Sequence, residues 1–123
     1  MALPELDRAV EKQPNDPYWR LFRLTAKVRL GQDADGDDVA GSREWPAPLI
    51  DFYASRISAD ALLQQAARCE HRSEALFHLA VVASYRRPNE ALPLWQKIVD
   101  GAPPISIEYC AARHELARLA TRV

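Results

Sequence analysis

The chain has 123 residues, of which 48% are hydrophobic and 27% are charged, which is typical of a globular protein and excludes a disordered one. This length suits one compact domain. Sixteen basic and seventeen acidic residues give a formal net charge of −1, so no overall positive field attracts nucleic acid or an anionic membrane.

The sequence also bears on the cellular compartment. No apolar run approaches the roughly 20 residues that span a bilayer, and residues 1–5 lack the basic start and apolar stretch of a secretory signal. We therefore expect a cytoplasmic protein, or a periplasmic one if a targeting segment has been removed. Cys69 and Cys110 are too few for a disulfide framework, so both are expected to be reduced and mostly buried.

Segments rich in alanine and leucine predict helix along nearly the whole chain, because glycine is scarce and alternating β-branched runs are absent. Pro17 should open a helix that Gly31 stops. The Ser58 hydroxyl should cap another helix by accepting a backbone N–H. In chain order, helices are expected over 2–13, 17–30, 47–55, 59–68, 73–86, 89–100 and 106–120, with a polar loop over 31–46.

Residues 2–14 and 91–103 form an internal repeat. Both copies begin with Ala-Leu-Pro, carry a valine at the same place and end in proline. A small first residue is followed after four residues by a large apolar one, Leu6 or Trp95, and after three more by Ala9 or Ile98. This spacing places the apolar residues on one helical stripe, which predicts an array of helical hairpins.

The repeat resembles the second helix of a tetratricopeptide repeat, and 73–86 resembles the first. The matching residues are Leu76, Leu79, Ala80 and Ala83 in the first helix and Ala91, Trp95, Ile98 and Pro103 in the second. Segment 17–30 is similar to a further first helix, although Thr25 departs from the usual glycine or alanine. The run from Trp45 to Leu119 resembles the C-terminal portion of larger bacterial tetratricopeptide proteins.

The resemblance implies an all-α solenoid of about seven helices, stacked as antiparallel hairpins. It also implies one domain over 1–123, with partial repeats over 2–30, short helices over 47–68, a complete repeat over 73–103 and a C-terminal helix over 106–120. Such modules carry no catalytic residue or cofactor and bind proteins or peptides on an inner groove. The expected function is therefore that of an adaptor or scaffold.

The groove positions that the resemblance assigns are largely aromatic. They are Trp19, Phe22 and Arg29 in one repeat and Phe77, Val81 and Tyr85 in the other. Aromatic anchors with an arginine are typical of binding hot spots, which favours an apolar peptide or helix as the partner over a charged tail. The alternative is that these rings fill the core.

The polar loop suggests a second function. Asp33, Asp35, Asp37 and Glu44 fall at the first, third, fifth and twelfth places of a calcium-loop pattern. Asp38 occupies the sixth place, where glycine makes the turn. The alternative to a calcium-responsive protein is a solvated acidic loop.

Two further clusters contain residue types that metal binding or catalysis would use. The triplet 69–71 (Cys-Glu-His) with His78 offers metal ligands, but it lacks the paired spacing of zinc sites, so a turn between helices is expected there. Cys110 and His114 stand one helical turn apart, as a nucleophile and its base would. No third orienting residue accompanies them, and a packed thiol beside a surface histidine is favoured over an all-α enzyme.

Two segments of the chain have a distinctive surface pattern. Arg20, Arg23 and Lys27 recur along one side of 17–30, where they would contact an acidic partner or, as we favour, form a solvated face. Segment 2–13 is a second helix without its first, so its apolar stripe should lack one packing partner. We expect a homodimer or higher oligomer through this N-terminal helix.

Overall fold

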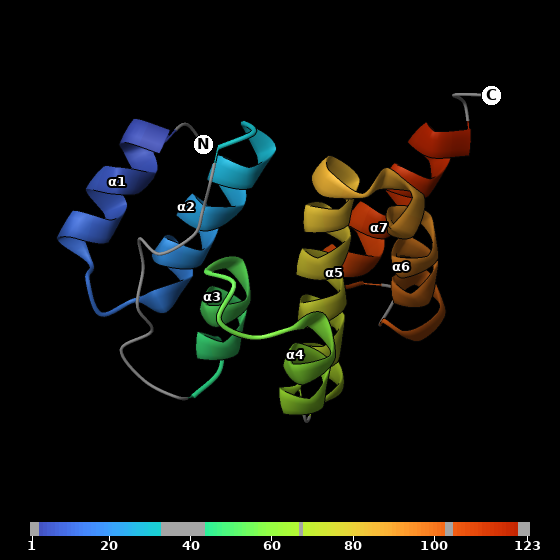
Figure 1. Ribbon diagram of the computed structural model, residues 1–123, viewed down its shortest axis with the longest axis horizontal. Helices are drawn as coiled ribbons and strands as arrows, with labels where there is room; N and C mark the ends of the chain where they lie inside the picture. Colours follow the sequence, from blue (N-terminus) through green and yellow to red (C-terminus); the bar gives the residue numbers. More distant parts are fainter. Residues whose placement is uncertain (1–2, 33–43, 67, 103–104, 121–123) are drawn as a thin grey trace. The chain divides into compact units, whose positions relative to one another are not determined.

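The computed structural model in Figure 1 describes residues 3–32, 44–66, 68–102 and 105–120. Its seven helices, in chain order, are α1 (Leu3–Lys12), α2 (Pro17–Arg29), α3 (Ala47–Tyr53), α4 (Ala59–Gln65), α5 (Cys69–Arg86), α6 (Pro88–Gly101) and α7 (Ile107–Ala120). No strand occurs within these described ranges. The predicted all-α class is confirmed.

The chain divides into two compact units, 1–65 with α1 to α4 and 66–123 with α5 to α7. Each unit has its own buried apolar residues, led by Leu21, Leu24 and Leu49 in the first and by Trp95 and Ile98 in the second. Two compact units can also be parts of one repeat array. The single domain over 1–123 therefore stays a prediction.

In the first unit, α1 and α2 form a hairpin whose ends are fixed by local chemistry. The Asp16 carboxylate accepts the Tyr18 N–H at 3.0 Å, and Pro17 occupies the first helical position. At the other end of α2, Gly31 has φ +73°. The N–H groups of Gly31 and Gln32 then bond to the last carbonyls of the helix, at 3.0 and 2.8 Å. The predicted stop at Gly31 is confirmed.

The α2 and α3 helices meet at a polar pair inside the first unit. The Thr25 hydroxyl donates to the Leu21 carbonyl oxygen at 2.9 Å and pairs with the Tyr53 hydroxyl at 3.1 Å. Tyr53 is buried, so this pairing keeps its hydroxyl from losing hydrogen bonds when it leaves water. Thr25 therefore links α2 to α3 through a side-chain hydroxyl that glycine or alanine would lack.

The short helices α3 and α4 end earlier than predicted, at Tyr53 and Gln65 in place of 55 and 68. After α3 the chain turns through Ser55 at φ +62°, and the Ser55 N–H bonds to the Phe52 carbonyl oxygen at 3.0 Å. This left-handed turn stops the helix as a glycine would. The predicted Ser58 cap is confirmed, since Ser58 Oγ accepts the Ala61 N–H at 3.1 Å.

In the second unit, α5 and α6 form a hairpin joined by the single residue Arg87, and α7 packs against both helices. The five successive residues of α5 from 79 to 83 are all buried. Such a stretch has no solvated face, so it forms the centre of this unit's core.

The α5 helix also begins earlier than expected. We predicted a turn over 69–71, but these residues form the first turn of α5, which starts at Cys69 and not at 73. Glu70 lies in that first turn, where an acidic side chain interacts favourably with the positive end of the helix dipole. The absence of proline or glycine between 69 and 73 leaves nothing to stop the helix there.

Trp95 is the anchor of the α5–α6 hairpin. Its side chain is 2% exposed, and its ring meets the edge of Phe77 at a centroid distance of 5.9 Å. Trp95 Nε1 donates to Ser84 Oγ at 3.4 Å, and Ser84 Oγ donates to the Ala80 carbonyl oxygen at 2.8 Å. The ring is therefore packed and its N–H is satisfied, as the repeat pattern requires of a large residue at this position.

Candidate interaction surfaces

Three aromatic rings cluster on the first turns of α2. The centroid of the Phe22 ring lies 6.1 Å from that of Tyr18 and 5.9 Å from that of Trp19, with Phe22 and Trp19 nearly perpendicular. Residues one turn apart share a helix face, which brings Tyr18 and Phe22 together. Phe22 is 46% exposed and the other two rings are half-buried. We call Tyr18, Trp19 and Phe22 the aromatic cluster.

A hollow of about 290 Å³ borders this cluster. It lies between α1 and the start of α2, and its lining consists of Glu5, Arg8, Ala9, Lys12, Gln13 and Trp19. Trp19 Nε1 donates to Gln13 Oε1 at 2.9 Å, which fixes the indole at the wall of the hollow. An apolar side chain could therefore contact an immobilised ring while charges of both signs remain around it.

The six predicted groove residues have different environments. Trp19 and Phe22 are brought together in the aromatic cluster, and Arg29 is exposed on the last turn of the same helix. In the second unit, Tyr85 is 54% exposed and Phe77 is half-buried against Trp95.

Val81 differs from the other five, because it is only 2% exposed and belongs to the run of buried α5 residues. Each step of four residues along a helix also turns the side chain by about 40°. Positions 77, 81 and 85 therefore do not stay on one solvated stripe. Phe22, Arg29 and Tyr85 are the predicted groove residues that a partner could reach most readily.

The cationic series on α2 is not the solvated face that we predicted. The Arg23 side chain is only 17% exposed, and its Nη1 lies 3.5 Å from Asp7 Oδ1 on α1. Arg20 and Lys27 are half-buried. Arg23 therefore forms part of the α1–α2 contact, where its long aliphatic stem can pack while its charged end stays near water.

The structure describes only some of the residues considered for calcium or metal binding. Asp33, Asp35, Asp37 and Asp38 lie outside the described residues, so the calcium loop stays a prediction, and Glu44 is exposed. His78 lies on α5 and its side chain is buried, with its ring centroid 5.1 Å from that of Phe77. Within the described part of the chain, no three His, Cys, Asp or Glu side chains are close enough to hold a metal ion.

Cys110 is exposed on α7, so the prediction that it is buried was wrong. Ala112, two residues further along α7, is the buried residue of this helix, and two residues correspond to a rotation of about 200°, so position 110 lies on the opposite, solvent-facing side. His114 is exposed one turn later, as predicted. The prediction for the Cys69 side chain lies outside what the structure describes.

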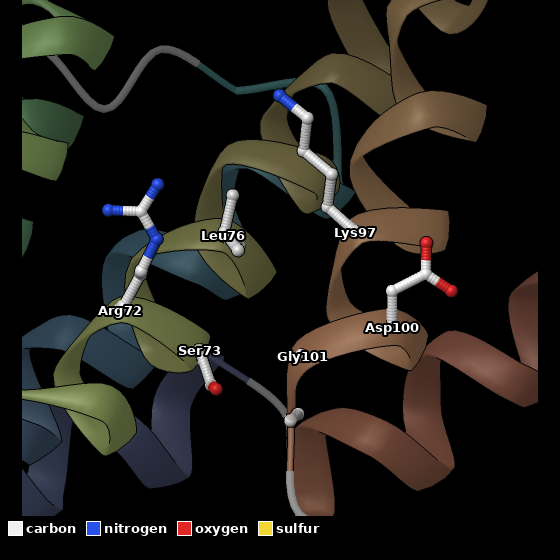
Figure 2. A pocket seen from close by; sticks show the side chains of 7 residues that line it. Arg72, Ser73, Leu76, Lys97, Asp100 and Gly101 are labelled. Atoms are coloured by element: carbon white, nitrogen blue, oxygen red, sulfur yellow. The ribbon is translucent and has the colours of Figure 1, made fainter.

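Sequence reasoning missed a second hollow, of about 280 Å³, between α5 and α6 (Figure 2). Arg72, Leu76 and Lys97 are among its lining residues. The hairpin pattern could have located it, because a one-residue link at Arg87 pairs positions at equal distances on either side, such as 76 with 98. Tyr18 was also missed, although its spacing from Phe22 was visible in the sequence.

None of the helices that the structure describes is long and apolar enough to cross a membrane. No protein-family model, curated protein or solved structure matches the chain.

Proposed function

We propose that the chain is a non-catalytic interaction module, an adaptor or scaffold of tetratricopeptide type, that binds an apolar peptide or helix. The proposal combines the repeat spacing in the sequence with one structural observation, the aromatic cluster of α2. Aromatic rings contribute much of the binding energy at protein interfaces, because they offer a large apolar area at a small entropic cost. The stacking of the hairpins into a solenoid and a bacterial, cytoplasmic setting belong to the same proposal.

The surroundings of the cluster favour an amphipathic helix over a charged tail. Phe22 leaves nearly half of its surface in water, so covering it releases apolar area. Glu5, Arg8 and Lys12 border the adjoining hollow and carry both signs of charge. A partner with one apolar stripe and mixed charges beside it could cover the rings and still pair with these side chains.

The direct test is binding of peptides selected from a phage-displayed random library against the whole chain. Phe22→Ala should weaken the selected peptides by about tenfold or more, which is the usual loss at an aromatic hot spot. Its melting temperature should change little, because the ring is half in water. Leu92→Ala is the matched control, since Leu92 is 50% exposed, close to the 46% of Phe22, but lies on α6 in the other unit. Equal losses in the two variants, or none in Phe22→Ala, would reject this surface.

We also propose self-association through α1. Leu3, Ala9 and Val10 are half-buried, so part of the apolar stripe of this helix remains accessible. Static light scattering over a tenfold range of concentration should give a mass that rises above the 13.9 kDa of one chain. A mass that stays at one chain throughout would reject this part of the proposal and leave peptide binding unaffected.

A further inference from the structure

The hollow between α5 and α6 has a floor of small and apolar residues and a charged rim. Leu76 and Ser73 are buried at its base, and Ala102 adds a third small or apolar contact. Figure 2 shows the Arg72 and Lys97 side chains on either side of Leu76, with Asp100 further along α6. The volume of about 280 Å³ is large enough for one or two side chains of a ligand.

The two cations of this rim, Arg72 and Lys97, have no ion-pair partner among the residues that the structure describes. Both side chains are exposed. Asp100 accepts a hydrogen bond from Gln96 Nε2 at 3.0 Å, so its carboxylate is held by a neutral amide on its own helix. Two cations and one carboxylate leave a single positive charge at the mouth of the hollow.

We propose that this hollow binds an acidic residue of a peptide segment, with its carboxylate between Arg72 and Lys97 and a neighbouring apolar side chain on Leu76. One carboxylate balances the excess charge, whereas a phosphate group carries about two negative charges at neutral pH and would be opposed by Asp100. A guanidinium can donate two parallel hydrogen bonds to a carboxylate, which gives Arg72 the larger share of recognition. This site is separate from the aromatic cluster of α2 and does not depend on it.

Titration of the isotopically labelled whole chain by NMR tests the proposal, with acetyl-Leu-Glu-Leu-amide as the probe. The amide signals of Ser73, Leu76 and Gly101 should shift and saturate. The matched glutamine peptide should bind at least about fivefold more weakly, as expected for loss of a charge-assisted hydrogen bond. Binding should also weaken when sodium chloride is raised, because the contacts are exposed charges.

Three variants and a control separate recognition from general electrostatics. Arg72→Gln and Lys97→Gln should each weaken the glutamate peptide by about threefold or more, whereas Arg113→Gln on α7 should leave it unchanged. Asp100→Asn should strengthen it by about twofold, since a repulsive carboxylate is removed. A loss of folding would not produce this opposite sign.

Several outcomes would overturn the proposal. They are equal binding of the glutamate and glutamine peptides, no saturable shift up to about 10 mM, and equal effects of Arg72→Gln and Arg113→Gln. Inorganic phosphate bound more tightly than the glutamate peptide would assign the hollow to phosphate instead.

Discussion

The repeated segment forms α1 in one unit and α6 in the other, and the two helices bury their matching residues to different extents. Leu6 and Trp95, the corresponding large residues, are 3% and 2% exposed. Three residues later Ile98 is fully buried, whereas Ala9 is half-buried. The α6 helix packs against both α5 and α7, while α1 packs against α2. Among the described helices, the same pattern therefore completes a core where two helices pack closely against it and leaves an accessible stripe where one does.

This difference predicts that substitutions in α6 affect the stability of the fold and that substitutions in α1 affect the binding of a partner. In α6 the large residue is an indole that fills the core, so changing it should damage the fold. In α1 the incompletely covered stripe borders the hollow beside Trp19, so changes there should affect partners more than folding.

The largest effect should come from removing the large residue of each copy. Trp95→Ala should lower the free energy of unfolding by about 3–5 kcal/mol, because it empties a closely packed site. Leu6→Ala should cost less, about 2–3 kcal/mol, since α1 has fewer neighbours and the site can relax. Urea unfolding followed by far-ultraviolet circular dichroism measures both. A larger loss of unfolding free energy in Leu6→Ala than in Trp95→Ala would contradict the contrast between α1 and α6.

The part-buried hydroxyl pair of the first unit, Thr25 with Tyr53, should show a smaller, coupled effect. A double-mutant cycle of Thr25→Val and Tyr53→Phe should give a coupling energy of about 1 kcal/mol, which is typical of a buried hydrogen bond. The equivalent polar contact of the second unit, between Ser84 and Trp95, is longer at 3.4 Å. Ser84→Ala with Trp95→Phe should therefore couple more weakly in the same unfolding assay. Additive effects at Thr25 and Tyr53 would mean that the pairing contributes nothing.

The smallest effect concerns two helix ends with the same backbone geometry and different residues. Gly31 has φ +73° after α2, and Ser55 has φ +62° after α3. A residue with a Cβ is strained there by about 1 kcal/mol, so Ser55→Gly should be more stable than Ser55→Ala by that amount. Gly31→Ala should lower the free energy of unfolding by a similar amount, because an added Cβ would be strained at this φ and would have no neighbour to pack against. If Ser55→Gly and Ser55→Ala melted at the same temperature, the left-handed conformation of residue 55 would be contradicted.

The sequence predicted the helices well because proline, glycine and capping residues mark their ends. Pro17, Gly31 and Ser58 each act through local hydrogen bonds or a restricted φ, which do not depend on distant contacts. The start of α5 was missed where no such residue stands. Its predicted turn lacked proline and glycine, so the helix extended back to Cys69.

The environments of individual side chains were harder to predict, because they depend on which neighbours a helix acquires. Arg23 was predicted to be a surface cation, but its side chain is only 17% exposed and contacts Asp7 of α1. Val81 looked like a groove position on a helix that is buried all round at that point. Cys110 showed the reverse, an apolar thiol turned to solvent. Periodicity along one helix assigns a face, but only packing decides whether water reaches it.

If the aromatic cluster of α2 is a binding surface, NMR mapping of a library-selected apolar peptide onto the chain should show the peptide there. The largest amide shifts should fall at Tyr18, Trp19 and Phe22 and on the α1 residues that line the adjoining hollow. Shifts that are largest on α6 or α7, with residues 18–22 unchanged, would show that the cluster is not the binding surface.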